Sequence, residues 1–415
     1  MNSFSFLLDL ALILISTKLL GLVTKRFQMP QVVGALLAGL LFGPAVLNLI
    51  TETDFIAKTS EIGVIVLMFT AGLETDIKEL KKTGKASFIV ALLGVLVPLA
   101  GGFGIAALFN NGAISDVPTS LFLQNLFIGV ILTATSVSIT VETLKEIGKL
   151  STRAGNAILG AAIIDDILGI VALTVITSFA DTSVNLWFVL AKILGFFVFS
   201  GVVGFIFYYL FNKFVNRYNR DMRRFVIVAF AFCLVLSFCA EQFFGVADIT
   251  GAYIAGLIIS NNPRSNYISS RFDTLSYMFL SPMFFASIGL KVSLPHMTTS
   301  ILIFSILLVV VAALTKILGC GLGAKLSRYT NHEAIQVGCG MISRGEVALI
   351  VADKGASLGL MSSVFFGPVI VTVIITTIIS PILLKLAFRS KNNQPDEPAT
   401  NSLVEDYVKM DEFNQ

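Results

Sequence analysis

The stretch 161–173, AAIIDDILGIVAL, places two carboxylates, Asp165 and Asp166, side by side within an apolar segment. The whole segment, 154–178, is long enough to cross a bilayer as a helix, since about 20 residues span the hydrocarbon core. An ionised carboxylate at the membrane centre costs a few kcal/mol, and adjacent carboxylates also repel each other. A chain tolerates such a pair only beside water, a cation or a buried base. We therefore expect the pair to handle positive charge within a membrane.

The composition extends this expectation to the whole chain. Hydrophobic residues make up 55% of the 415 residues, charged residues only 13%, and the mean hydropathy is +0.87. The apolar runs are too long for membrane strands and lack their alternation, so we expect an all-α polytopic membrane protein. About thirteen helical spans are predicted, near 4–24, 30–49, 55–73, 85–109, 120–144, 154–178, 184–211, 223–243, 246–261, 269–290, 298–325, 332–356 and 362–388.

The distribution of Lys and Arg predicts the orientation of these spans. Loops on one side carry nearly all of the basic residues, whereas the opposite set holds only Lys58, Lys291 and Lys354. Because cytoplasmic loops are enriched in Lys and Arg, the N-terminus is expected outside and the C-terminus in the cytoplasm. The net charge of +3 is then a topology signal, and no nucleic-acid partner is expected. The first segment lacks a basic n-region and reads as a retained helix, not a signal peptide.

An internal repeat is visible in the small residues. The stretch 34–40, GALLAGL, resembles 251–257, GAYIAGL, and 69–73, FTAGL, resembles 285–290, FASIGL, at the same separation. Small-residue matches alone also arise from helix packing, but equal separation favours a repeat. The units would be spans two to six and nine to thirteen, which start on opposite sides of the membrane. Such inverted repeats are typical of secondary transporters, whose sites lie at mid-membrane between the repeats.

Two predicted spans contain poor helix formers where a span should be most regular. They are the hydroxyl-rich run 133–140, TATSVSIT, and its counterpart 338–346, GCGMISRGE. If both spans unwind and cross, the half-helix ends need compensating charge, which Arg344 and Glu346 are placed to supply. The alternative is that the hydroxyls bond to preceding carbonyls within ordinary helices.

Lys316, in AALTKILG at 312–319, is predicted close to the membrane midplane. It is too deep to reach the interface easily, although a snorkelling lysine or a structural ion pair remains the alternative. Burial disfavours the charged form of both Lys and Asp, so each needs the other to stay charged. Neighbouring residues on a helix project about 100° apart, so one aspartate can pair with Lys316 while the other faces an aqueous cavity.

Other residues carry weaker signals. The four cysteines all fall within predicted spans, so a disulfide framework is not expected. His296 and His332 fall near loops and cannot form a metal site alone, and a pH-sensing role for either is disfavoured. No phosphate-binding glycine motif is present, so we expect no cofactor and no ATP-driven pumping. The chain is not expected to be an enzyme, because an aspartyl protease needs carboxylates converging from separate helices.

These features together resemble the monovalent cation:proton antiporter-2 family, most closely its NapA-type sodium/proton antiporters. The motifs that carry the resemblance are 33–44, VGALLAGLLFGP, 72–74, GLE, 133–137, TATSV, Asp165-Asp166, Lys316 and 344–346, RGE. The resemblance implies an NhaA-like fold with two crossed broken helices and a homodimer. It also assigns Asp165 to Lys316 and Asp166 to the ion, and paired aspartates resemble the electrogenic subgroup.

The resemblance further implies a division of the chain. Dimer-domain helices would occupy 1–84 and 215–297, core-domain helices 85–180 and 298–389, and a linker helix 181–214. The remaining segment, 390–415, is polar and contains Pro395 and Pro398, so we expect it to be a disordered cytoplasmic tail.

The expected function is electrogenic Na+ (or Li+)/H+ exchange by alternating access in the plasma (inner) membrane. Protons and the cation would compete for Asp166, and oxygen atoms of Thr133 or Thr135 would help to bind the cation. Lys316 or Asp165 would carry the second proton. Potassium as the substrate is the nearest alternative, since selectivity depends on cavity size and ligand geometry. A sodium-coupled symporter or a channel of the same fold is disfavoured by the Asp–Lys pair.

Overall fold

Helices make up all regular structure in the part of the chain that the computed structural model describes, which is residues 5–27, 29–75, 77–110, 117, 119–180, 186–217, 222–291 and 299–389. Within these residues eight helical segments are long and apolar enough to cross a membrane. They are α1 (Ser5–Arg26), α3 (Asp54–Glu74), α4 (Ile77–Phe109), α7 (Arg153–Ala180), α8 (Leu186–Arg217), α9 (Arg223–Cys239) with the π-helical turn Ala240–Phe244, α13 (Thr299–Leu326) and α16 (Phe366–Phe388).

Shorter helices lie where the other spans were predicted. Two of the predicted spans are each divided into two helices by an irregular segment, and another contains a π-helical turn. The shorter helices are α2 (Gln31–Phe42), α5 (Leu121–Ile131), α6 (Val137–Glu146), α10 (Asp248–Ser260), α11 (Ser265–Leu275), α12 (Ser281–Leu290), α14 (Asn331–Gly340) and α15 (Glu346–Ser357).

The predicted span 30–49 was too long. Helix α2 ends at Phe42, and Gly43 has extended backbone angles, φ −79° and ψ −175°. Pro44 explains the end, because its ring disfavours the helical conformation for the preceding residue and it has no amide to continue the ladder. The apolar residues that follow, such as Val46 and Leu49, are exposed outside the helix.

Side-chain caps define several helix starts. Thr53 accepts the amide of Ile56 at the start of α3. Thr330 and Glu333 form a reciprocal capping box at the start of α14. Such caps satisfy amides that have no partner within the helix, so these helices begin close to where their capping residues stand.

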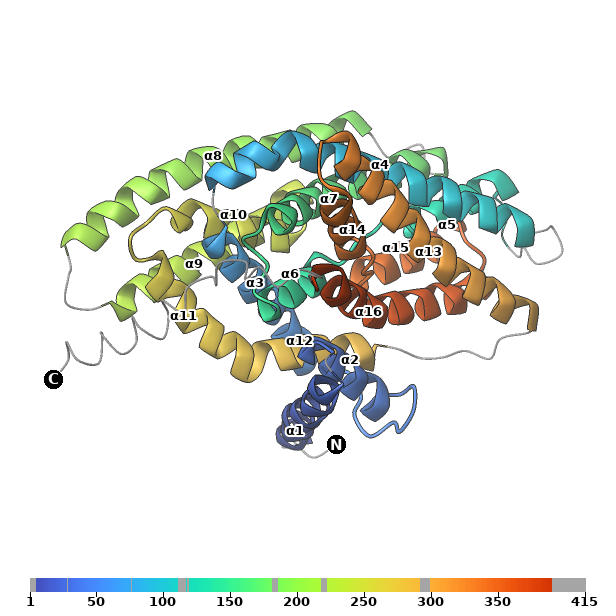
Figure 1. The fold of residues 1–415 in the computed structure, drawn as a ribbon, viewed down its shortest axis with the longest axis horizontal. Coiled ribbons are helices and arrows are strands. Elements are labelled where there is room, and N and C mark those ends of the chain that lie inside the picture. The colour runs from blue at the N-terminus through green and yellow to red at the C-terminus, as the bar shows by residue number, and fades with distance from the viewer. Residues whose placement is uncertain are drawn as a thin grey trace.

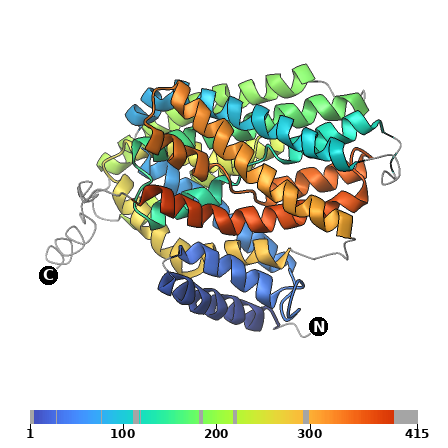
Figure 2. The same cartoon turned by 45° about the vertical axis from the view of Figure 1, so that its right-hand side comes forward.

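The helices fall into two groups that pack mainly within themselves. The first group contains α4, α5, α7, α13, α14, α15 and α16, and the second contains α1, α2, α3, α9, α10, α11 and α12. Helices α4 and α13 run alongside each other in the first group, and α1 lies at one edge of the molecule beside α2 and α12 (Figures 1 and 2). Helix α8 contacts α7 of the first group and α10 of the second.

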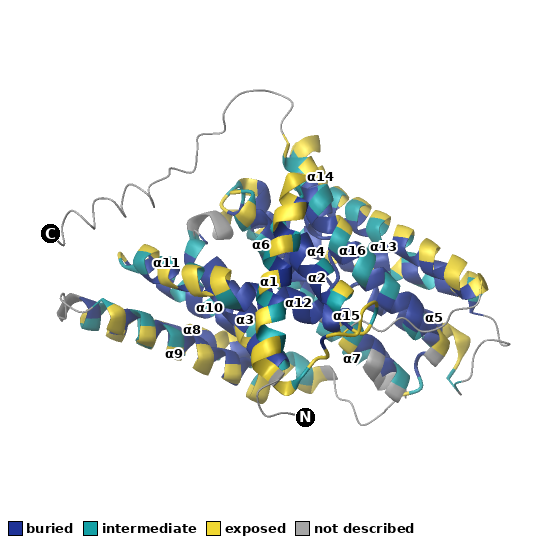
Figure 3. Cartoon of the chain, turned by 90° about the horizontal axis from the view of Figure 1, so that it is seen from below, coloured by how far each residue is buried: buried dark blue, intermediate teal, exposed yellow. Residues whose placement is uncertain are grey.

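Large apolar side chains cover much of the outer surface. Leu22 of α1, Phe205 of α8 and Ile227 of α9 are exposed by 65%, 74% and 68%. Figure 3 shows exposed residues along the outer faces of α1, α8 and α9, whereas buried residues gather around α2 and α12. A water-soluble protein rarely exposes so much apolar surface. The chain is a multi-pass membrane protein whose outer faces suit lipid.

The glycines of the predicted repeat mark two close helix contacts. A Cβ at Gly72 of α3 would collide with the backbone of α10 around Gly256, and a Cβ at Gly256 would collide with α3 around Gly72. In the same way Gly39 of α2 and Gly289 of α12 meet backbone to backbone. Small residues permit this approach between membrane helices. Each unit of the predicted repeat thus supplies one helix to each contact.

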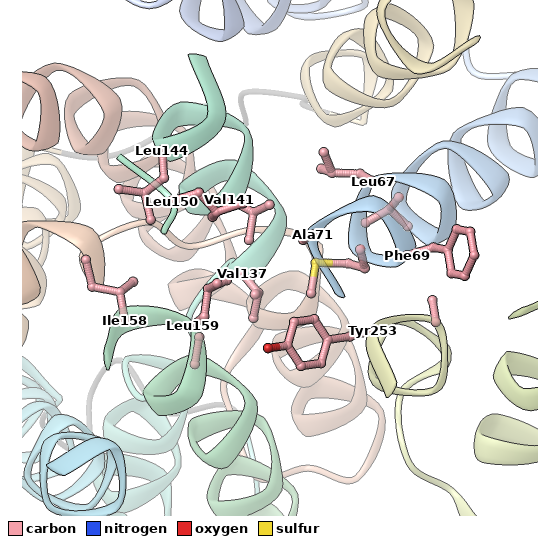
Figure 4. Close-up of a cluster of buried hydrophobic side chains, with 14 of the residues drawn as sticks. Leu67, Phe69, Ala71, Val137, Val141, Leu144, Leu150, Ile158, Leu159 and Tyr253 are labelled. Carbon is pink, nitrogen blue, oxygen red and sulfur yellow. The ribbon is translucent and has the colours of Figure 1, made fainter. Parts of the chain in front are cut away.

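The boundary between the two helix groups is apolar. Figure 4 shows buried side chains of α3 and Tyr253 of α10 facing side chains of α6 and α7 across this boundary. Ala71 of α3 lies on the side of this boundary, whereas Phe69 points away from it, toward Phe272 of α11. The side chains of the first group and the adjoining α6 are Val137, Val141, Leu144, Ile158 and Leu159. At these positions of the described boundary there are no ion pairs. Such a boundary suits two helix groups that slide or repack against each other.

Candidate functional site

Two interrupted helices meet at their breaks. Helix α5 ends at Ile131 and α6 begins at Val137, while α14 ends at Gly340 and α15 begins at Glu346. The backbone amide of Ser136 donates to the carbonyl of Ser343 at 2.8 Å, and the Ser343 hydroxyl donates to the carbonyl of Ser136 at 2.9 Å. The segments 132–136 and 341–345, here called the paired breaks, therefore satisfy each other's backbone groups, which buried irregular backbone requires.

Further hydroxyls fasten the paired breaks. Thr140 of α6 donates to the carbonyl of Gly340 at 2.7 Å and lies 2.9 Å from the Ser343 hydroxyl. Thr377 of α16 donates to the carbonyl of Arg344. Thr133 instead donates to Val130 within its own chain segment, at 2.7 Å. The alternative in which the hydroxyls bond to preceding carbonyls of their own segment thus holds for Thr133 but not for Thr140.

Arg344 compensates the end of a half-helix. Its side chain is 1% exposed and donates to the carbonyl of Leu132, the C-cap residue of α5, at 2.6 Å. It also donates to the carbonyls of Ile342 and, across to α13, of Ala312, at 2.8 and 3.1 Å. A positive group is favourable at a helix C-terminus because the carbonyl dipoles point there. The side chain of Glu346, predicted to act with Arg344, lies outside the described part of the structure.

Lys316 of α13 and Asp165 of α7 form a buried ion pair. The Lys316 ammonium donates to both carboxylate oxygens of Asp165, at 3.0 and 3.2 Å. The two side chains are 0% and 1% exposed. Each charge needs the other in such surroundings, because an unpaired charge away from water is far more costly.

Asp166 has different surroundings from its neighbour. It is only partly buried, and no residue in the described segments donates a hydrogen bond to its carboxylate or pairs with it. The Thr135 hydroxyl, 2% exposed, lies beside Asp165 and has no hydrogen-bond partner of good geometry among the described atoms. Carboxylate and hydroxyl oxygens are the ligands that a hard cation prefers. These residues therefore combine an ion pair with unused oxygen ligands.

Packing around the ion pair involves residues that were not expected from the sequence. A Cβ at Gly94 of α4 would stand 2.6 Å from the Cys320 sulfur and 3.8 Å from both Asp165 Oδ1 and Lys316 Nζ. Glycine at this position lets the α4 backbone cover the pair. Cys320 follows Lys316 by one helical turn, and that spacing is the only sequence signal that could have found it.

The last turn of α6 is tied to the second helix group. Lys145 lies 3.1 Å from Glu74 of α3 and 2.9 Å from Asp273 of α11, and it also donates to Thr70. Burial lowers the pKa of Lys145, but the Glu74 and Asp273 carboxylates outweigh it, and the pKa lies above its usual range. A cavity of about 320 Å³ adjoins this cluster. No local sequence signal predicts the charge cluster of Lys145, Glu74 and Asp273, because its members come from three separate segments.

A membrane chain with paired helix breaks and a buried Asp–Lys pair beside them belongs, by fold and site, to the class of secondary transporters. The profile of the family described as "Sodium/hydrogen exchanger, transmembrane" matches residues 11–389. The chain belongs to this family, whose members are cation/proton antiporters, that is transporters and not enzymes.

Two curated relatives are similar along nearly their whole length. The "Na(+)/H(+)-K(+) antiporter GerN" of Bacillus cereus is 37% identical over 94% of this chain and 98% of its own. The "Na(+)/H(+) antiporter" of Enterococcus hirae is 37% identical over 91% of this chain and 96% of its own. Among solved structures, the sodium proton antiporter MjNhaP1 of Methanocaldococcus jannaschii has the same fold, with a TM-score of 0.68, 20% identity and coverage of 94% and 99%.

Proposed function

We propose that this protein is an electrogenic Na+ (or Li+)/H+ antiporter of the plasma membrane that works by alternating access. The observation that carries the proposal is the unequal state of two adjacent carboxylates. Asp165 is held by Lys316, whereas Asp166 has no partner among the described residues. A carboxylate that binds either a proton or a cation, but not both, makes exchange obligatory if the empty charged site cannot cross.

The chain's own residues divide the work as follows. Asp166 loses its proton and binds the cation, with oxygen atoms of Thr135 or Thr133 and water completing the shell. Thr135 is the better candidate, because the Thr133 hydroxyl already serves the Val130 carbonyl. When the cation enters, Asp165 releases Lys316, and Lys316 or Asp165 carries a second proton. Exchange of two protons for one monovalent cation moves net charge across the membrane.

The finer architecture is part of the proposal. We infer thirteen spans in an NhaA-like fold with inverted repeats, and the reciprocal contacts of Gly72 with Gly256 and of Gly39 with Gly289 support the inversion. The first helix group would be the moving core domain of 85–180 and 298–389. The second group, from 1–84 and 215–297, would form the homodimer, and the segment 390–415 lies outside the described residues.

The NapA-type branch and the membrane orientation rest on sequence alone. The paired aspartates and the motif around Arg344 support the branch, and the one-sided distribution of Lys and Arg supports an external N-terminus and a cytoplasmic C-terminus. This orientation can be tested with single cysteines placed in the loops beside Lys58 and Lys213. A membrane-impermeant thiol reagent is added from outside, and labelling of each cysteine is measured. Reaction from outside is expected beside Lys58 and not beside Lys213, and the reverse pattern would contradict it.

Potassium is the second candidate cation. One similar relative is named an Na+/H+-K+ antiporter, and the "K(+)/H(+) antiporter 1" of Saccharomyces cerevisiae is 28% identical over 92% of this chain and 46% of its own. Proteoliposomes given Na+, Li+ or K+ side by side separate the two. Dissipation of a pH gradient by K+ alone would replace sodium with potassium in the proposal.

The site assignment is tested with matched variants in the same proteoliposomes. Asp166→Asn should abolish Na+-driven proton exchange, whereas Asp9→Asn, the same change in α1, should leave it intact. If Asp166→Asn exchanges Na+ like the wild type, the assignment is wrong. An imposed membrane potential should change the rate of exchange, and a rate that ignores the potential would remove electrogenicity from the proposal.

A further inference from the structure

A positively charged cavity opens where the ends of α1, α6 and α16 meet. Its volume is about 690 Å³. Four basic residues line it, and they come from three parts of the chain, namely Arg26, Lys149, Lys385 and Arg389. This cavity is separate from the paired breaks and from Asp166, and nothing in the proposed exchange uses it.

The charge of the cavity is only partly neutralised from within. Glu146 is the one carboxylate in its described lining, and its two oxygens accept the backbone amide of Gln31 at 2.8 and 2.7 Å. Among the described residues, no carboxylate lies within ion-pair distance of Arg26, Lys385 or Arg389. The cavity therefore keeps a net positive charge that suits an anion.

The walls of the cavity also suit a hydrocarbon chain. Phe27 and Leu386 belong to its lining and are exposed by 68% and 55%. Both stand at the ends of predicted membrane spans, on the side where basic residues collect. Exposed apolar side chains beside clustered cations fit a molecule with an anionic head and an apolar tail better than they fit a small soluble anion.

We propose that this cavity binds the phosphodiester headgroup of an anionic phospholipid from the cytoplasmic leaflet. The headgroup phosphate lies among Lys385, Arg389 and Arg26, and an acyl chain follows Phe27 and Leu386 outward. Because Glu146 closes α6, the bound lipid also contacts the interrupted helix that forms one of the paired breaks. The lipid would thus link α1 and α16 at the end of that helix.

Native mass spectrometry of the purified full-length protein, with added phosphatidylglycerol or phosphatidylcholine, tests the proposal. The wild type should retain phosphatidylglycerol in preference to phosphatidylcholine. Lys385→Gln/Arg389→Gln should weaken phosphatidylglycerol binding about tenfold or more, since each cation near an anionic lipid contributes. The matched control is Lys325→Gln/Arg328→Gln, which removes one exposed Lys and one exposed Arg on the same predicted side but outside the cavity. It should bind like the wild type.

Four results would overturn the proposal. Equal loss in both double variants would mean general attraction between basic loops and lipid. Displacement of the lipid by millimolar inorganic phosphate would assign the cavity to a free anion. Binding that appears only when the acidic segment 390–415 is deleted would make that segment the occupant. Equal binding of phosphatidylcholine would remove the charge argument altogether.

Discussion

At the scale of single residues, Lys316 and Asp165 share one dry environment, and each is the other's only opposite charge at hydrogen-bond distance among the described residues. Buried ion pairs add little net stability compared with apolar replacements, but removing one partner leaves a costly unpaired charge. The pair is therefore sensitive to single changes and tolerant of a double one. That property suits a pair that opens and closes during a transport cycle.

The ion pair can be tested by its coupling. Lys316→Ala should lower the stability by about 3 kcal/mol, because Asp165 is left without its base. Adding Asp165→Asn should recover much of that loss. Thermal unfolding in detergent of both single variants and the double variant measures the effect. Losses that simply add in the double variant would mean that the two side chains do not interact in solution.

The two threonines should differ in their effect on the cation. Thr135→Val removes an unpaired buried hydroxyl, so we expect the apparent KM for Na+ to rise about tenfold, the effect of one hydrogen bond or ligand to a charged group. Thr133→Val removes a hydroxyl already bonded to Val130 and should change KM less. Sodium titrations of exchange in proteoliposomes provide the comparison. A larger effect at Thr133 would exchange the two roles.

At the scale of elements, the paired breaks act as one unit because hydroxyls and backbone groups join them. Thr140 and Ser343 bridge α6 and α14, and Thr377 ties α16 to the same unit. Arg344 joins this unit to α5 and α13. Lys145 then connects the far end of α6 to α3 and α11. If the first helix group moves, the second group must either move with α6 or lose the contacts that Lys145 makes with α3 and α11.

The contact at Lys145 has a defined pH dependence. Its pKa is raised from 10.5 in the folded protein, so its stabilising contribution is complete below about 10.5 and is lost as the pH rises through the folded pKa. The difference in Tm between the wild type and Lys145→Gln should stay constant from pH 7 to pH 9 and shrink in strong alkali. A difference that shrinks between pH 7 and pH 9 would show that the ammonium is not stabilised by Glu74 and Asp273.

The sequence predicts where the two helices are interrupted, but not which hydrogen bonds join the two interruptions. Clusters of Gly, Ser and Thr in two apolar spans predict interruption, because these residues are poor helix formers in those positions. Which threonine is free depends on where α5 ends, and helix ends are uncertain by a few residues. The choice of Asp165 over Asp166 for Lys316 came from the family resemblance. The partners of Lys145 depend on distant segments and carry no local signal.

At the scale of the whole molecule, two helix groups meet along a largely apolar boundary (Figure 4). The second group is held by reciprocal glycine contacts. The contacts of α3 with α10 and of α2 with α12 each join the two units of the predicted repeat. A rigid second group beside a mostly apolar boundary, crossed among the described residues by the ion pairs of Lys145 at the end of α6, is the arrangement expected if one body moves against the other.

The glycine contacts make the rigidity testable. Gly72→Ala should destabilise the protein by about 1–3 kcal/mol, because the added methyl collides with the α10 backbone. Gly256→Ala, its reciprocal, should have a similar effect. Gly201→Ala, in a helix where a Cβ meets open space, should be neutral or slightly stabilising. Thermal unfolding compares the three, and equal stability of Gly72→Ala and Gly201→Ala would contradict the close packing.

The central claim is that a proton and a cation compete for Asp166, and the pH dependence of the apparent KM for Na+ tests it most directly. Currents from proteoliposomes on a solid support give KM at each pH. Competition by one proton raises KM about tenfold for each unit by which the pH falls below the site's pKa, and two protons raise it more steeply. The maximal current should stay nearly constant over the same range. A KM that does not change with pH, while the maximal current falls, would contradict competition at Asp166.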